Sequence, residues 1–288
     1  MTGVVKISLI YSSHLKPKLL SQSIILSFIF CLAGLSCTAQ KKEATKIPGW
    51  QLDWADEFNY EGRPDTTIWN YDADVKNANY ELQYYTRRYP ENVKVSNGLL
   101  TIRANKENYK ESNYTSARMV TRGKKDILYG RIEVCAQLPK GRGTWPAIWM
   151  LSSKLPRVYP DDGEIDIMEH VGYEEGIITG AAHVKRNTTG TEIISNTSTT
   201  VLQDATEKFH VYGLIWTPTR LEWQVDGKTF YFYDKADRPA HHWPFNKAFY
   251  LILNIAIGGT WGGKQGIDDS VFPQSMKIDY VRVYSKKN

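Results

Sequence analysis

The chain has 288 residues, 42% of them hydrophobic and 23% charged, a composition that fits a packed globular core and excludes a disordered chain. The formal net charge is +5, but the first 37 residues hold Lys6, Lys16 and Lys18 and no acidic residue. The remaining 33 basic and 31 acidic residues give a body with a charge of only +2, so there is no electrostatic case for binding nucleic acid.

The N-terminal residues 1–37 have the pattern of an export signal. Lys16 and Lys18 precede an apolar run at residues 24–35, which is too short for a comfortable membrane span. The run ends in Gly34-Leu35-Ser36-Cys37, which resembles a bacterial lipobox with Cys37 as the acylated residue, although Gly34 stands where leucine is usual. We therefore expect an outer-membrane or cell-surface lipoprotein, with a periplasmic or secreted protein as the alternative.

Residues 38–48 read as a short polar tether, and residues 49–288 as a single domain, because no linker, repeat or low-complexity stretch interrupts them. After cleavage at Cys37, Cys135 would be the only thiol of this domain. One cysteine cannot form an internal disulfide, so core burial must stabilise the fold. We expect a monomer.

The domain carries the signals of strands and no long amphipathic helical period. Asp226-Gly227 separates two alternating runs and predicts a tight hairpin. Many short strands with turn residues between them favour a sandwich or barrel, and the length favours an all-β, two-sheet antiparallel jelly roll. The predicted strands are 99–104, 130–138, 209–216, 221–225, 229–233, 250–257 and 276–284.

Three acids alternate with apolar residues in Glu164-Ile165-Asp166-Ile167-Met168-Glu169. In a strand, Glu164 and Asp166 share one face and Ile165 and Ile167 the other. Glu169, five positions after Glu164, would point into the core at severe cost. A β-bulge near Ile167 or Met168 would return it to the face of Glu164.

Three carboxyl groups in one row cannot all ionise readily at pH 7, so at least one pKa should rise. Retaining glycoside hydrolysis needs this combination: an ionised nucleophile and a protonated acid about 5–5.5 Å apart. Asp166 could share a proton with the nucleophile. Two alternatives stay open, namely an edge strand with solvated acids and a metal site that combines the acids with His170, whose ring should turn away from the row.

Residues 141–151 read as a loop that enters a strand, and period-two alternation puts Trp145, Ala147 and Trp149 on one face. Two indole rings separated only by alanine form an apolar shelf on which sugar rings can stack. Both tryptophans could instead be core residues. A sugar platform becomes the better interpretation if this strand lies beside the carboxylate row.

At this point the chain resembles the family 16 glycoside hydrolases, and within them the bacterial laminarinases. The acidic motif is similar to the E-x-D-x-x-E signature of that family, and the resemblance runs from about Trp50 to Tyr284. The other matching stretches are 54–58, 81–85, 114–118, 145–151, 243–245, 253–259 and 279–284.

The resemblance implies a concanavalin A-like jelly roll with a concave substrate cleft and no cofactor for catalysis. It implies Glu164 as nucleophile, Glu169 as general acid/base and Asp166 as the assisting acid. Trp145 and Trp149 would line the donor subsites, and the cleft would also contain Asn79, Glu81, His183 and Trp261. A structural calcium would be held by Glu57, the Gly98 carbonyl and Asp279, which are oxygen ligands of the kind that calcium prefers.

The implied substrate is a β-1,3-glucan of the laminarin type, cleaved internally. Three alternatives remain: a mixed-linkage glucan, a galactan such as agarose or carrageenan, and a glucan-binding module without catalysis. A sulfated galactan would call for a basic cleft, and Arg118, Arg142 and Arg157 form no cluster in the sequence that requires one.

Overall fold

A computed structural model describes residues 46–74, 77–236 and 238–287 of the protein. The predicted signal, Cys37 and most of the polar tether lie outside these residues. No helix in the described part of the chain is long and apolar enough to cross a membrane. Cys135 is buried and forms no disulfide within the described residues.

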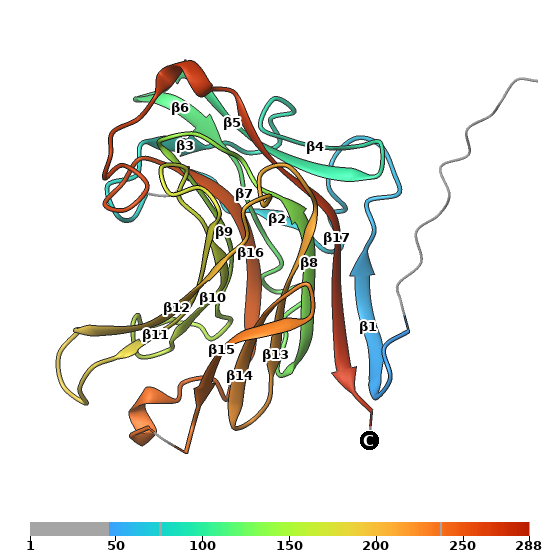
Figure 1. The fold of residues 1–288 in the computed structure, drawn as a ribbon, viewed down its shortest axis with the longest axis vertical. Coiled ribbons are helices and arrows are strands. Elements are labelled where there is room, and N and C mark those ends of the chain that lie inside the picture. The colour runs from blue at the N-terminus through green and yellow to red at the C-terminus, as the bar shows by residue number, and fades with distance from the viewer. Residues whose placement is uncertain (1–45, 75–76, 237, 288) are drawn as a thin grey trace, which may run out of the picture. The chain divides into compact units, whose positions relative to one another are not determined.

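Two stacked β-sheets make up the fold, and all their strand pairs are antiparallel except one, the parallel pair β3–β6 (Figure 1). The first sheet has the order β15-β14-β13-β8-β17-β5-β6-β3, with β1 added to β17 and β4 to β5. Its strands are β1 (Trp50–Asp56), β3 (Gln83–Tyr85), β4 (Val93–Ser96), β5 (Leu99–Tyr109), β6 (Ser112–Ser116), β8 (Gly130–Gln137), β13 (His210–Trp216), β14 (Arg220–Val225), β15 (Lys228–Asp234) and β17 (Gln274–Lys286).

The second sheet has seven strands in the order β12-β11-β10-β9-β16-β7-β2. They are β2 (Asn70–Tyr71), β7 (Arg118–Val120), β9 (Thr144–Ser152), β10 (Glu164–Glu169), β11 (Ile177–Lys185), β12 (Ile193–Val201) and β16 (Phe249–Ile257). Its outer face is concave, as Figure 1 shows. Among the described residues the only helices are two short 3₁₀ turns, η1 (Ala240–His242) and η2 (Asp269–Val271).

The core lies between the two sheets and is built by alternation along each strand. In β16, Leu251, Leu253 and Ile255 face the core, while Ile252 between them belongs to a separate apolar cluster with Trp149 on the other face. All nine residues of β16 are buried, so this strand is covered on both faces. The predicted all-β sandwich is confirmed, and each predicted strand is present with ends shifted by a few residues at most.

Candidate active site

The three acids of β10 lie on the outer face of the seven-stranded sheet because the strand contains a bulge. Asp166 pairs with Trp149 of β9, and the next paired residue is Met168, opposite Ile148, so Ile167 is the extra residue. The ladder with β11 shifts at the same place. Ile165, Ile167 and Met168 pack in the core, and Glu169 returns to the side of Glu164. The predicted bulge is confirmed.

A tryptophan from the opposite sheet supports the bulge from within the core. The indole Nε1–H of Trp223 on β14 donates a hydrogen bond to the Asp166 backbone carbonyl at 2.7 Å, and the side chain is fully buried. Gly180 on β11 makes room for this ring, since a Cβ there would lie 2.6 Å from Trp223 Cδ1. The irregular backbone thus has a hydrogen-bond partner where the regular ladder is interrupted.

Burial keeps protons on the carboxyl row. Burial alone raises the pKa of Asp166 to about 8, and burial together with the charge of Asp166 raises the pKa of Glu164 and of Glu169 to about 8. Groups this strongly coupled titrate as one unit. At neutral pH the row therefore retains protons, which the acid of a catalytic carboxyl pair requires.

His183 lies over the row from β11, as predicted for a cleft histidine. Its Nε2 is 2.7 Å from Asp166 Oδ2 and 3.9 Å from Glu164 Oε1, and its Nδ1 is 2.8 Å from Ser195 Oγ. A charge on His183 lowers the pKa of Glu164 and so favours its ionised form. Glu164, Asp166 and His183 each offer one ligand atom within 4.8 Å of the others, so a divalent cation could bind there and would cover Glu164.

Trp145 and Trp149 lie on the same outer face, beside the row. The Trp145 indole donates to Glu169 Oε1 at 3.0 Å and packs edge-on against Trp261, with ring centroids 5.5 Å apart. The Trp149 indole donates to Asn254 Oδ1 at 2.6 Å. Trp145 is buried, whereas Trp149 is partly exposed. The rings therefore pack locally and also lie next to the acids, and their role as a sugar platform stays a prediction.

Asn79 and Glu81 lie at the same end of the site as Trp261. Glu81 forms a bridge with Gly258 at the end of β16, and its carboxylate accepts from Gln83 Nε2 at 2.9 Å and from Asn79 Nδ2 at 3.5 Å. Burial raises the pKa of Glu81, and its charge in turn raises that of Glu169. The structure thus brings the predicted cleft residues to one face.

The loop between β9 and β10 adds a residue that the sequence did not reveal. Partial burial, followed by the charges of Glu164, Asp166 and Glu169, raises the pKa of Tyr159, so its hydroxyl lies within electrostatic range of the row although the residue is 42% exposed. The Tyr-Pro pair at 159–160, just before the acidic motif, was the available signal.

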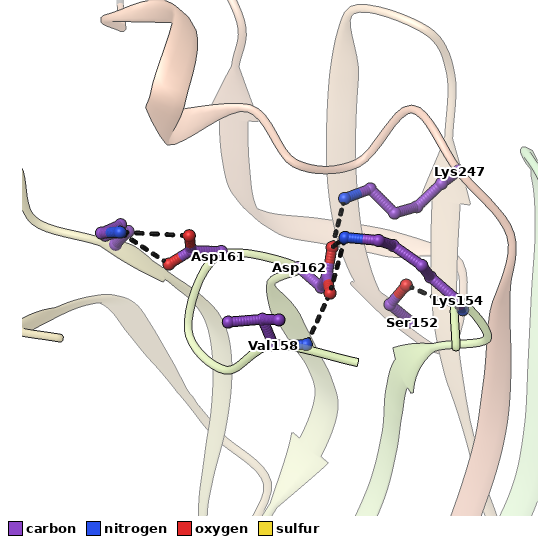
Figure 2. A network of polar contacts seen from close by, with 7 residues as sticks. Ser152, Lys154, Val158, Asp161, Asp162 and Lys247 are labelled. Carbon is purple, nitrogen blue, oxygen red and sulfur yellow. Dashed lines mark hydrogen bonds and ion pairs between the residues drawn. The ribbon is translucent and has the colours of Figure 1, made fainter. Parts of the chain in front are cut away.

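Figure 2 shows how this loop is fixed. Buried Asp162 accepts from Lys247 Nζ at 2.7 Å, Lys154 Nζ at 3.1 Å and the Val158 amide at 2.7 Å, and Asp161 pairs with Lys185. Although burial opposes it, these bonds lower the pKa of Asp162. An ionised anchor therefore holds the segment that carries Tyr159.

Two further side chains clarify the site. The Arg118 guanidinium lies 4.7 Å from the centre of the Trp149 ring, a cation–π contact that the sequence did not predict. The same guanidinium pairs with Asp72 at 3.2 Å.

His170 is buried, with Nδ1 3.0 Å from the Ile177 carbonyl oxygen. It turns away from the acids as expected, so the metal site built on His170 is not formed.

The strand register brings the three predicted calcium ligands to neighbouring strand ends. Asp279 is a bulged residue of β17, between Ile278 and Tyr280. Glu57 lies close to it because the preceding residue, Asp56, pairs with Val281. Gly98 lies close to it because Leu100, two residues later, pairs with Ile278. Both Glu57 oxygens also accept from Arg282, at 2.7 and 2.9 Å. The oxygen donors suit calcium, and the site stays a prediction.

Comparisons with known proteins agree with this geometry. The family model described as "Glycosyl hydrolases family 16" matches residues 80–282. A beta-glucanase of Rhodothermus marinus is 47% identical over 250 residues, 83% of this chain and 86% of the relative. The laminarinase structure from the same organism superposes with a TM-score of 0.78 at 44% identity, covering 84% of this chain and all of the other.

The structure of SCLam, named a non-specific endo-β-1,3(4)-glucanase, gives a TM-score of 0.77 at 42% identity, over 85% of this chain and 95% of that one. The match to the family model covers more than half of the chain and includes the whole carboxylate row. On these grounds the chain belongs to family 16 of the glycosyl hydrolases.

Proposed function

We propose that this protein is an endo-β-glucanase that cleaves β-1,3-glucan with retention of anomeric configuration. The observation that carries the proposal is the bulged strand β10, which puts Glu164, Asp166 and Glu169 on one face beside Trp145 and Trp149. A pair of carboxyl groups on one face, one acting as proton donor and the other as nucleophile, is the machinery of retaining glycoside hydrolysis.

In the proposed mechanism Glu164 attacks the anomeric carbon while protonated Glu169 donates its proton to the leaving glycosidic oxygen. The resulting glycosyl-enzyme ester is then hydrolysed by a water molecule that Glu169, now ionised, deprotonates. The pKa of about 8 supplies the proton on Glu169 at neutral pH. Asp166 and His183, 2.7 Å apart, position Glu164 and take up the charge changes around it.

Substrate choice is supported by the names of the relatives, which include a beta-glucanase, a laminarinase and an endo-β-1,3(4)-glucanase. Mixed-linkage glucan is therefore the nearest alternative, and agarose or carrageenan the more distant ones. Incubation with laminarin, mixed-linkage glucan, agarose and carrageenan, followed by product sizing, separates them. Release of oligosaccharides from laminarin at the highest rate is expected, and faster cleavage of a galactan would reject the proposal.

Removing either glutamate should abolish turnover. We expect Glu164→Gln and Glu169→Gln each to lower laminarin cleavage by roughly 10³-fold or more, because each step loses its nucleophile or its proton donor. Reducing-end assays give the rate, and circular dichroism confirms folding. Glu175→Gln, an exposed acid in the loop after β10, is the matched control and should stay active; full activity of either catalytic variant would end the assignment.

We propose further that the protein is exported and acylated at Cys37. The support is the sequence pattern of residues 16–37 alone. Labelled palmitate should enter the wild-type protein in a bacterial host and not the Cys37→Ser variant. Equal labelling of the two, or none in either, would leave plain secretion as the better account.

A further inference from the structure

Tyr80 is held in a backbone conformation that large residues avoid. Its φ is +58° and follows a φ of +53° at Asn79, while its side chain is 86% exposed. Glycine and asparagine adopt this left-handed region readily, whereas a bulky residue there is an outlier. Since the ring remains in solvent, burial does not offset the strain. A strained backbone conformation that no burial of the side chain compensates indicates that Tyr80 serves function and not the stability of the fold.

The segment around Tyr80 forms a thin wall at one end of the catalytic face. Leu82 N–H donates to the Ile257 carbonyl at 2.9 Å, and Thr260 N–H donates to the Asn79 carbonyl at 2.8 Å. Glu81 lies next to Gly259 and its charge raises the pKa of Glu169, whereas Tyr80 and Leu82 line a hollow with the glycines that follow β16. The segment therefore has a charged group near the catalytic row and apolar groups at the hollow.

A hollow of about 400 Å³ lies beside this segment. Tyr80 and Leu82 form one wall, Ile267 the opposite one, and Gly258, Gly259 and Gly263 lie between them. A Cβ at Gly258 would stand 3.0 Å from Ile267 Cδ1 and 3.2 Å from Leu82 Cδ1. Because these glycines carry no side chain, space remains between Leu82 and Ile267, and the glycine backbone forms the floor of the hollow beside the exposed Tyr80 ring.

The hollow is continuous with the catalytic face through one residue. A Cβ at Gly259 would lie 3.4 Å from Trp145 Cζ3 and 3.2 Å from Glu81 Cγ, so this glycine borders the Trp145 wall and the hollow at once. Trp145 in turn bonds Glu169. A polymer that passes Trp145 therefore reaches the hollow at Gly259.

We propose that Tyr80 and this hollow, the Tyr80 hollow, bind a stretch of the β-1,3-glucan chain beyond the catalytic row. The ring would stack on the C–H face of a glucose unit, as aromatic rings do on flat apolar surfaces, and the exposed Thr260 hydroxyl would meet sugar hydroxyls. The occupant is the substrate polymer itself, and this inference rests on the proposed function. The hollow favours long chains over short ones.

The test uses Glu164→Gln protein, which cannot turn over substrate, with Tyr80→Gly or Tyr80→Phe added. Calorimetric titration measures the Kd for laminarin and for laminaritetraose. Tyr80→Gly should weaken laminarin binding roughly fivefold, the size of one aromatic contact, and leave laminaritetraose within about twofold. Tyr80→Phe keeps the ring and should bind as the parent does. The thermal midpoint of Tyr80→Gly should be equal or higher, because glycine relieves the strain.

Two outcomes overturn the inference alone: equal laminarin affinity of the Tyr80→Gly and Tyr80→Phe proteins, or an equal loss for laminaritetraose, which would place Tyr80 within the catalytic subsites. Failure of the proposed function gives a different signature, since the wild-type protein would then release no reducing ends from laminarin, and this inference would fall with it.

Discussion

In the proposed mechanism Glu169 has to hold a proton when the substrate arrives and accept one back later, and its surroundings shift its pKa in opposite directions. Burial and the charge of Asp166 raise its pKa, while the Trp145 N–H and the charge on His183 lower it. The balance at about 8 lies close to the working range that general acid–base catalysis favours. One indole N–H, 3.0 Å from Glu169 Oε1, therefore helps to set the pH range of the enzyme.

Replacing Trp145 with Phe should shift that range. The lost N–H stabilises the ionised form, so its removal raises the pKa of Glu169 and moves the alkaline limb of kcat/KM to higher pH. Loss of one hydrogen bond of about 1 kcal/mol should also lower kcat/KM roughly fivefold. Trp149→Phe is the control, because its indole bonds Asn254 and not an acid. An alkaline limb at the same pH in both variants would contradict this role.

For individual residues, the sequence predicted where the three acids lie, but it missed Tyr159 and the contact of Arg118. The alternation from Glu164 to Glu169, together with the cost of burying a carboxylate, was enough to predict the row and its bulge. Tyr159 was missed because its position depends on Asp162, whose partner Lys247 is 85 residues away. Arg118 was noted only as a charge, because its contact with Trp149 joins strands on either side of β16.

The bulge is the element on which the site depends, and it is supported across the core. Trp223 comes from the other sheet, so nothing within residues 163–170 could have indicated it, although its strand was predicted. The hydrogen bond to the Asp166 carbonyl fixes the backbone at the point where Glu169 is turned outward. A change at Trp223 should therefore reach the chemistry without touching the substrate.

Trp223→Phe should lower kcat by roughly tenfold with little change in KM, since a misplaced acid affects the transition state more than binding. It should also cost about 1–3 kcal/mol in the free energy of unfolding, from the cavity and the unpaired carbonyl. The matched control is Trp216→Phe, because Trp216 is equally buried and donates to the Phe245 carbonyl. If the two variants have equal kcat values, Trp223 only packs in the core and does not position the catalytic acids.

For the molecule as a whole, the sequence predicted the sandwich because the strand and turn signals are local. It could not predict which strands are neighbours, since pairs such as β1 with β17 join residues more than 200 positions apart. The predicted calcium site depends on such pairs. We propose that calcium, if bound by Glu57, Gly98 and Asp279, ties the start of the domain to its last strand.

Calcium should then raise the thermal midpoint of the wild-type protein by a few degrees, about 1 kcal/mol for a domain of this size, and a chelator should reverse the effect. Differential scanning calorimetry with calcium or EDTA measures it. Glu57→Gln also loses its pair with Arg282, so its baseline will fall; the informative quantity is its response to calcium, which should vanish. A wild-type midpoint that is unchanged by calcium would remove the site.

Strand β17 follows all the other strands in the chain, yet it lies in the middle of its sheet, between β8 and β5, and carries β1 on the same ladder (Figure 1). Neither half of that sheet can be completed before residues 274–286 have left the ribosome. The strands on either side of its place, β8 and β5, are therefore joined only when β17 inserts between them, which makes its insertion the step that completes the sheet.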